Sequence, residues 1–359
     1  MLDVGIVTTG HDVADARLHR ICAALRRRGL TVGVLGLGEA KGAPKDVATQ
    51  TAPRRGPVVR AVRALLWPWR LRARVLVSLD PDSALGVAVR TRLDPRRPRF
   101  VSDVHEDYAA LLRDRSWAHG WLRVGAAAAA RSGQWVSTTA HLTVVADDHL
   151  LPAAPRRLVV RNLPDLSAVP EPGPRDTTPR AVYIGDIRRS RGLRTMVEAV
   201  RDAPGWHLDL VGPINSSDDR AWLEHVLDEG LGDRVRWHGR QPPAQAWTIA
   251  RGAWVGLLLL DDTPAFRDAL PTKLYEYLAA GLAVVATPLP RVREMLERTR
   301  TGVLVNTPGA AAQQLRAWER EPALIETVRA AAADLRSGGE LRSSELDELA
   351  AGVAVLARG

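Results

Sequence analysis

Two carboxylates flank the start of an expected helix in the second half of the chain. Asp268 stands just before this helix, and Glu276 lies within it, eight residues further on. The first backbone N–H groups of a helix lack internal partners, so those near Leu270–Thr272 can bind an anion. A phosphate held there, with a carboxylate on either side accepting hydroxyl hydrogen bonds, describes a bound nucleotide sugar. The alternative is structural: Asp268 only caps the helix, and Glu276 is a solvated helix residue.

The sequence around these carboxylates has the signals of a helix with defined ends. An apolar run that ends at Leu260 precedes it, and a loop joins the two. Proline is preferred at the first helical position, where Pro271 stands, and Gly281 follows where a left-handed cap is wanted. We therefore expect a helix over Pro271–Ala280, beginning after the carboxyl end of a strand.

Short apolar runs alternate with helix-length amphipathic stretches along almost the whole chain. Such alternation indicates parallel sheets covered by helices on both faces. The expected strands are Asp3–Thr8, Thr31–Leu35, Arg74–Leu79, Arg99–Ser102, His141–Val145, Arg157–Val160, Arg180–Ile184, Trp206–Val211, Arg234–His238, Trp254–Leu259, Ala283–Ala286 and Gly302–Leu304. The expected helices include Ala14–Arg28, Thr195–Arg201, Asp218–Asp228 and Pro271–Ala280.

A proline-rich segment without apolar periodicity, Leu163–Arg180, interrupts the alternation and is typical of a linker. A chain of 359 residues is also longer than most single cores. We therefore expect an α/β fold with two Rossmann-like, doubly wound parallel-sheet domains facing a cleft (GT-B). The expected parts are an N-terminal acceptor domain over 1–165, a linker over 166–179, a C-terminal donor domain over 180–340, and a helix over 341–359 that packs back across the domains.

The composition, with 46% hydrophobic and 25% charged residues, is that of an ordinary soluble globular protein. Cys22 is the only cysteine, which excludes a disulfide framework or a cysteine-rich metal site, and its apolar helical surroundings indicate a buried, inert thiol. The first residues lack the features of a signal peptide, and no apolar run approaches the ~20 residues needed to cross a bilayer. We expect a cytoplasmic protein.

The net charge of +9 raises the question of nucleic-acid binding. No RNA-binding aromatic signature, zinc finger or dominant basic tail accompanies the charge, so we expect no nucleic-acid partner; an anionic donor or membrane surface accounts for it. The segment Pro57–Arg74 combines apolar residues with several arginines, and Pro68 should bend or end its helix. It is either a surface helix packed on the first domain or a basic amphipathic element that binds anionic lipid at the inner face of the membrane.

Other chemistries lack their motifs. The chain has no P-loop Gly-Lys-Ser/Thr sequence, no Gly-x-Ser-x-Gly elbow and no His-Glu-x-x-His zinc helix. Asp80-Pro81-Asp82 follows an expected strand and could imitate the metal-binding Asp-x-Asp of single-domain glycosyltransferases, but it equally suits a turn and a helix cap. We favour the turn and cap, and expect no bound metal and no cofactor beyond a nucleotide-diphosphate sugar as co-substrate.

The carboxylate-flanked helix resembles a known site. The sequence LPTKLYEY at 270–277, with Ala280-Gly281 after it, resembles the donor site of GT-B retaining glycosyltransferases of family 4. That family carries a glutamate, seven residues and a second glutamate; the first approaches the sugar and the second binds the donor ribose. The resemblance implies these roles for Asp268, a shorter departure from glutamate, and for Glu276. It implies that the residues between them bind the donor too: Ala269, Leu270, Pro271 and Thr272.

A second match lies at 181–200 (AVYIGDIRRSRGLRTMVEAV), which resembles the opening strand and glycine loop of that family's donor domain. A basic pair in this loop grips the donor diphosphate and stabilises the charge of the leaving group. Arg191 matches the second member of the pair, whereas the usual first position is Asp186 here, so Arg188 or Arg189 would have to substitute. The donor contacts implied by this and the following strand-plus-loop matches are Gly185, Arg188, Arg189, Arg191, Gly212 and Arg240.

In the first half, the stretch Ser102–Tyr108 follows an expected strand and resembles a family stretch in which a histidine lies beside the transferred sugar. The resemblance places His105 there, so the implied catalytic residues are His105, Arg191 and Asp268. The opening loop Thr8–Arg17 should face the acceptor and the donor phosphate. Its expected contacts are Gly10 on the donor side, and His11 and Arg17, together with Asp103 and His105, on the acceptor side.

The matches together imply a metal-independent hexosyltransferase. It would move a sugar, with retention, from a UDP-, GDP- or dTDP-linked donor to a hydroxyl of a glycan, glycolipid or specialised metabolite. Two alternatives remain open at this point. One is a nucleotide-sugar epimerase or a phosphorylase on the same architecture. The other is a non-catalytic nucleotide-sugar-binding partner of another transferase, which aspartate at the family positions Asp186 and Asp268 favours.

Overall fold

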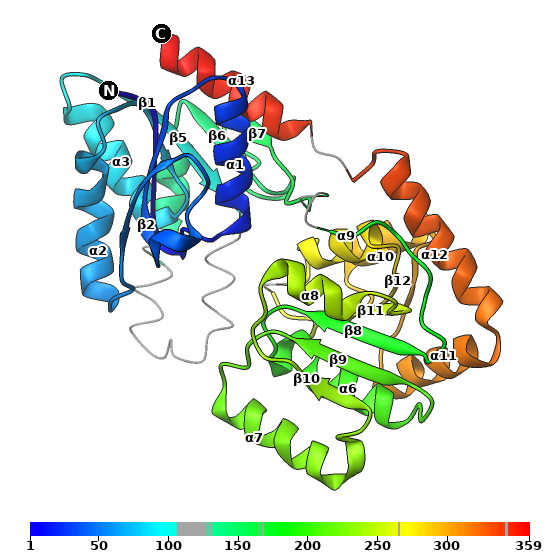
Figure 1. Cartoon of the computed structure of the whole chain (residues 1–359). Helices are drawn as coiled ribbons and strands as arrows, with labels where there is room; N and C mark the ends of the chain where they lie inside the picture. Colours follow the sequence, from blue (N-terminus) through cyan, green and yellow to red (C-terminus); the bar gives the residue numbers. More distant parts are fainter. Residues whose placement is uncertain (106–127, 129–130, 165, 167–168, 265, 342–343) are drawn as a thin grey trace. The chain divides into compact units, whose positions relative to one another are not determined.

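The structure is a computed structural model, and it describes residues 1–105, 128, 131–164, 166, 169–264, 266–341 and 344–359. The chain divides into two compact units, 1–162 with 343–359, and 163–342. Each unit is built around one sheet of parallel strands (Figure 1). The expected fold class, two Rossmann-like α/β domains with parallel sheets, is confirmed.

The first unit has a seven-stranded sheet in the order β3-β2-β1-β4-β5-β6-β7. Its central strand β1 is largely apolar, as expected of a strand covered on both faces; Val4, Ile6 and Val7 are inaccessible to solvent. The strands are β1 Leu2–Asp12, β2 Val32–Leu37, β3 Ala48–Ala52, β4 Ala73–Ser78, β5 Arg99–Val104, β6 Leu142–Val145 and β7 Arg157–Val159. The described helices are α1 Ala16–Arg27, α2 Pro57–Leu66, α3 Pro81–Leu93 and α13 Glu345–Arg358, with the short helical turns η1 Ala40–Gly42 and η2 Trp67–Arg70.

The second unit has a six-stranded sheet in the order β10-β9-β8-β11-β12-β13. Its strands β11 and β12 are buried along their whole length. The strands are β8 Arg180–Ile184, β9 His207–Val211, β10 Val235–Trp237, β11 Val255–Leu258, β12 Ala283–Ala286 and β13 Gly302–Leu304. The described helices are α6 Leu193–Arg201, α7 Ser217–Val226, α8 Pro243–Ala250, α9 Thr272–Ala279, α10 Pro290–Thr299, α11 Pro308–Arg320 and α12 Pro322–Ser337, with the turns η3 Arg189–Arg191 and η4 Leu227–Leu231.

Three local features differ from the expectation. Strand β3 (Ala48–Ala52) was not expected, because its sequence ATQTA is polar; as an edge strand it pairs with β2 alone. Strand β1 continues to Asp12, so Gly10 and His11 lie on the end of a strand and not in a loop. Helix α9 begins at Thr272, and Pro271 is its extended cap residue, with ψ at 136°, so Pro271 is not the first helical residue.

The proline-rich segment, expected as a linker, packs along the second unit. The Asp176 N–H donates to the Gly252 carbonyl at 2.8 Å, and the indole of Trp254 donates to the Asp176 carbonyl at 2.8 Å. Arg336 of α12 donates to the Pro170 carbonyl at 2.6 Å. Backbone groups that regular structure leaves unpaired are thus satisfied by side chains.

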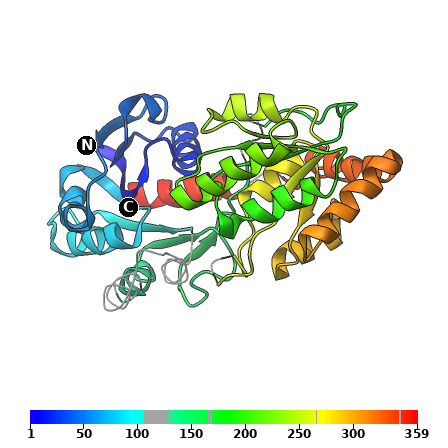
Figure 2. The same ribbon diagram turned by 90° about the horizontal axis from the view of Figure 1, so that it is seen from below.

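The last helix, α13, belongs to the first unit. Its Leu349 and Val353 are buried in the same apolar cluster as Ile21 and Leu25 of α1. Both views show this helix, drawn in red, beside the N-terminal elements (Figure 1, Figure 2). Among the residues that the structure describes, no helix is long and apolar enough to cross a membrane.

Candidate functional site

The sheet of the second unit has a topological switch point between β8 and β11. From β8 the chain moves outward to β9 and β10, and it then returns to the other side of β8 as β11. Helix α6, after β8, buries its side chains in one apolar cluster, and α9, after β11, buries its side chains in another. The loops that follow β8 and β11 therefore diverge, which is where ligands bind in open parallel sheets. Most of the expected donor residues lie on these loops.

Two expected donor glycines end the neighbouring strands β8 and β9. The Gly185 N–H donates to the Val211 carbonyl at 2.7 Å, and the Gly212 N–H donates to the Gly239 carbonyl at 2.8 Å. Gly212 has φ +149°, and a Cβ there would collide with the Gly185 carbonyl. Glycine is thus required at 212 by backbone packing, with or without a ligand. Arg240, which directly follows Gly239 in the sequence, is exposed.

The loop after β8 holds two arginines around one carboxylate. The Nε atoms of Arg188 and Arg191 lie 3.6 Å and 3.9 Å from Oδ2 of Asp186. Both guanidinium groups lie 5.9 Å from the centre of the Phe266 ring, which belongs to the loop after β11. Arg189 is exposed and is not part of this cluster. The structure therefore brings Arg188 and Arg191 together at the switch point.

The start of α9 carries the other expected donor residues. Asp268, Ala269 and Leu270 precede it; Asp268 is exposed, and its backbone carbonyl accepts a long hydrogen bond from Arg291 at 3.5 Å. Glu276 lies half-buried in the second helical turn. Asp268 thus precedes the first turn of α9, and Glu276 follows it.

Lys273 is a candidate that the sequence reasoning missed. Its side chain is half-buried, and a Cβ at Gly185 would collide with its Nζ, so the ammonium lies at the end of β8. Burial, followed by the charge of Arg191, lowers the pKa of Lys273 to about 8. The signal was present in the sequence as the lysine within LPTKLYEY, three residues before Glu276.

In the first unit, the end of β1 meets the end of β4 at the corresponding switch point. His11 Nδ1 lies 2.8 Å from Oδ1 of the buried Asp80, and His11 Nε2 lies 3.0 Å from His105 Nε2. A carboxylate, a histidine and a second histidine thus form a chain that ends at His105. Burial acts to raise the pKa of Asp80, but its hydrogen bond with His11 and the charges of His11 and Arg60 outweigh this and hold it below the usual range.

The carboxylate of Asp80 also accounts for the glycine at position 10. The Asp80 carboxylate accepts the backbone N–H groups of Thr9 at 2.7 Å and Gly10 at 3.2 Å, and a Cβ at Gly10 would collide with it. Asp80 stands at the cap position of α3, as expected, but its side chain bonds β1 and makes no cap hydrogen bond. Asp82 accepts a hydrogen bond from Arg60 at 2.6 Å.

Arg17 and Asp103, both expected near the acceptor, bind each other. Arg17 donates from Nε at 2.7 Å and from Nη2 at 2.6 Å to the two oxygens of Asp103. Its Nη1 donates to the Val160 carbonyl at 2.9 Å. Only 6% and 1% of the two side chains are exposed. His105 Nδ1 lies 4.0 Å from Asp103, so this buried pair supports the histidine chain.

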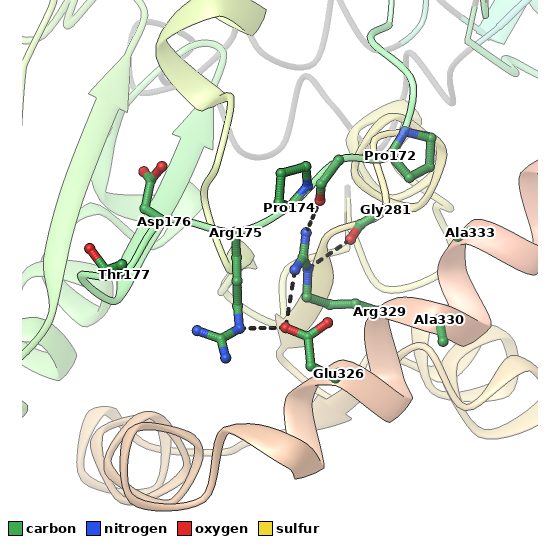
Figure 3. A pocket seen from close by; sticks show the side chains of 11 residues that line it. Pro172, Pro174, Arg175, Asp176, Thr177, Gly281, Glu326, Arg329, Ala330 and Ala333 are labelled. Atoms are coloured by element: carbon green, nitrogen blue, oxygen red, sulfur yellow. Dashed lines mark hydrogen bonds and ion pairs between the residues drawn. The ribbon is translucent and has the colours of Figure 1, made fainter.

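A separate pocket of about 510 Å³ lies beside the proline-rich segment and α12 (Figure 3). Its cations are already occupied: Arg329 donates to the Gly281 carbonyl at 3.1 Å and to the Gly173 carbonyl at 2.8 Å. Arg175 pairs with Glu326 and lies 3.9 Å from the Trp254 ring centre. The pocket is therefore where this segment is attached to the unit, and the donor candidates lie outside it.

Within the described parts of the chain, no group of three His, Cys, Asp or Glu side chains could hold a metal ion.

The comparisons with known proteins agree with this architecture. Residues 168–334 match the model of the family "Glycosyl transferases group 1". A putative teichuronic acid biosynthesis glycosyltransferase, TuaH of Bacillus subtilis, is 28% identical over 113 residues, a match that spans 32% of this chain and only 28% of that protein.

Two solved structures show the same fold at low identity. Sucrose-phosphate synthase from Thermosynechococcus elongatus superimposes with a TM-score of 0.73 and 15% identity, over 100% of this chain and 98% of that one. Anabaena HepE in complex with UDP-glucose superimposes with a TM-score of 0.72 and 14% identity, over 99% of this chain and 100% of that one. The chain thus has the two-domain GT-B fold, and residues 168–334, which lie within its second unit, match the glycosyl transferases group 1 model.

Proposed function

We propose that this protein transfers a hexosyl group from a nucleotide-diphosphate sugar to an acceptor hydroxyl, with retention of configuration and without a metal ion, as in family 4. The observation that carries the proposal is the cluster at the β8–β11 switch point. There Arg188 and Arg191 lie beside Asp186 and near the ring of Phe266, which belongs to the loop that leads to α9 and its Glu276. Cations and free helix N–H groups suit a diphosphate, and a carboxylate suits ribose hydroxyls.

The proposed roles follow the two units. The second unit binds the donor, with Arg191 on the diphosphate, Glu276 on the ribose and Asp268 near the sugar. The first unit binds the acceptor, with His105 at the reacting sugar. Same-face attack, in which the leaving phosphate helps to remove the acceptor proton, accounts for retention without an enzyme nucleophile. The group 1 match over 168–334 and the solved neighbour with bound UDP-glucose support a nucleotide-sugar donor.

The test is a panel of UDP-, GDP- and dTDP-sugars with candidate acceptors, followed by nucleoside diphosphate release and by NMR of the product's anomeric proton. We expect one donor to be consumed and its anomeric configuration to be kept. Glu276→Ala and Arg191→Ala should abolish transfer while circular dichroism stays unchanged. Arg201→Ala, at an exposed arginine that ends α6 and has no role in the proposed site, is the matched control. Full activity of Glu276→Ala and Arg191→Ala would refute the site.

A non-catalytic donor-binding role is the second candidate. Asp186 holds the place of a family cation and pairs with Arg188 and Arg191, which reduces the positive charge of the loop. Donor binding without diphosphate release for any acceptor would favour this role. A change in the configuration of the free sugar nucleotide would favour an epimerase instead.

We further propose that α2 and α3 bind the anionic inner face of the cytoplasmic membrane. Nine of the thirteen large apolar residues that are exposed within the described chain lie on these two helices and the turn η2. They are Val58, Val59, Val62, Leu65, Leu66, Trp69, Leu85, Val89 and Leu93. The helices touch closely, because a Cβ at Gly86 of α3 would collide with the Ala64 carbonyl of α2. Exposed arginines, Arg55 and Arg70, border this surface in sequence.

Vesicle cosedimentation tests the membrane proposal. We expect binding to vesicles with 30% phosphatidylglycerol (roughly the anionic fraction needed for electrostatic attraction), and weakening by salt as charges are screened. Val62→Ser with Leu65→Ser should reduce binding several-fold. Val355→Ser, at a more exposed valine on α13, is the control. Equal binding of all variants, or none to anionic vesicles, would overturn the proposal.

A further inference from the structure

We propose that Lys273, from the first turn of α9, binds the donor diphosphate together with Arg191. The position that usually carries the first basic residue of this pair is Asp186 here, and Lys273 supplies the missing cation. The inference rests on the proposed nucleotide-sugar function and adds a residue to its site. It starts from a half-buried ammonium group that makes no hydrogen bond and no ion pair with the described residues.

The surroundings of Lys273 Nζ are unusual for a lysine. Within the described residues the ammonium makes no hydrogen bond and no ion pair, and the centre of the Tyr183 ring lies 5.3 Å from it. By contrast, the exposed Lys41 has a carboxylate partner, Glu39, at 2.7 Å. Partly burying a charge without a partner costs free energy, so such a group calls for a ligand of opposite charge.

The position of Lys273 places this charge at the switch point. Nζ lies against the backbone of Gly185, the residue that ends β8 and precedes the basic loop. Arg191, from the other side of the same loop, is close enough for its charge to lower the pKa of Lys273. Lys273 therefore brings a cation to the end of β8, where the loop that carries Arg191 begins.

Asp186 explains why the cation comes from α9. Its carboxylate lies 3.6 Å from Arg188 and 3.9 Å from Arg191, so it pairs with the arginines of its own loop and orients them. As an anion itself, Asp186 cannot bind the diphosphate. Lys273, from α9, places a second cation at the end of β8, where this loop begins. The charged and titratable groups around its ammonium are Arg188, Arg191, Asp186, Glu276 and Tyr183.

Calorimetric titration with UDP, GDP, dTDP and the corresponding nucleosides tests the inference. We expect Lys273→Met to weaken the preferred diphosphate at least tenfold and the nucleoside hardly at all, because the lost interaction is a charge-assisted contact to phosphate. Lys273→Arg should recover part of the affinity. Lys45→Met, at an exposed lysine, is the matched control. Unchanged diphosphate affinity in a folded Lys273→Met protein would overturn the inference.

A second measurement is independent of sugar transfer. The chain has three lysines, Lys41, Lys45 and Lys273, so ¹³C-methylated lysine side chains give few, resolvable NMR signals. The signal that is lost in Lys273→Met should titrate near pH 8 in the free protein and at a higher pH once the diphosphate is bound. The signals of Lys41 and Lys45 should not change when the diphosphate binds. A Lys273 titration that the bound diphosphate does not move would overturn the inference alone. Failure of every nucleoside diphosphate to bind the wild type would overturn the proposed function with it.

Discussion

Replacing Asp103 with asparagine removes the charge from a buried pair in the first unit. In the native protein both oxygens of Asp103 accept hydrogen bonds from Arg17, at 2.7 Å and 2.6 Å, and almost none of either side chain is exposed. Asparagine keeps the shape but offers one acceptor oxygen and no charge. Breaking a buried pair from one side costs about 3–5 kcal/mol. Because one hydrogen bond can survive in Asp103→Asn, we expect a loss of about 3 kcal/mol.

Urea unfolding measures this loss. With a slope of about 2 kcal/mol per molar urea, a loss of about 3 kcal/mol lowers the midpoint by roughly 1.5 M. The transition of the first unit should move, while that of the second unit, which does not contain the pair, should stay. The reasoning is refuted if Asp103→Asn unfolds at the wild-type midpoint but loses affinity for its acceptor, since the pair would then serve the substrate and not the fold.

The same variant predicts a pH dependence. Burial acts to raise the pKa of Asp103, but the charge and hydrogen bonds of Arg17 outweigh it and leave the pKa below the ordinary 3.8. A depressed carboxylate pKa stabilises the fold above the unfolded value, and this contribution is lost as the pH falls toward the folded value. The stability difference between wild type and variant should therefore be constant above about pH 5 and shrink below about pH 4. The double variant Arg17→Met/Asp103→Leu should lose far less stability, since no unpaired charge remains.

Three further outcomes follow from single contacts. Tyr277→Phe should cost the second unit about 1–3 kcal/mol in urea unfolding, because the Ile184 N–H loses its acceptor at 3.1 Å; an unchanged midpoint would contradict this. Gly212→Ala should destabilise by about 1–3 kcal/mol or more, whereas Gly309→Ala, where a Cβ meets open space, should have little effect; equal midpoints would show that residue 212 tolerates a side chain. Lys273→Met should be at least as stable as wild type at pH 7. The free energy of unfolding of the wild type should rise relative to that of Lys273→Met between about pH 8 and 10.5, because the folded protein releases the lysine proton first. A stability difference that does not change with pH would argue against a half-buried ammonium.

Strands and helices of the second unit were largely predictable from the sequence. The apolar runs at Arg180–Ile184 and Ala283–Ala286 became β8 and β12 with the expected ends, because strands buried on both faces have no polar positions to blur the pattern. Strand β3 had no such signal. Its residues ATQTA pair on one side only, so their strand conformation depends on β2 and not on their own preferences.

Sequence by itself determined the switch-point loops and the residue types that they carry: two carboxylates, several arginines and the glycines that parallel strands end on. Only the tertiary structure decided which of them meet. Asp186 pairs with Arg188 and Arg191, and Arg17 is occupied by Asp103. Lys273 reaches the end of β8 from helix α9, 87 residues after Asp186 in the sequence. The reason is that hydrogen bonds and charge pairs act over a few ångströms, whereas sequence patterns report only which strand or helix a residue belongs to.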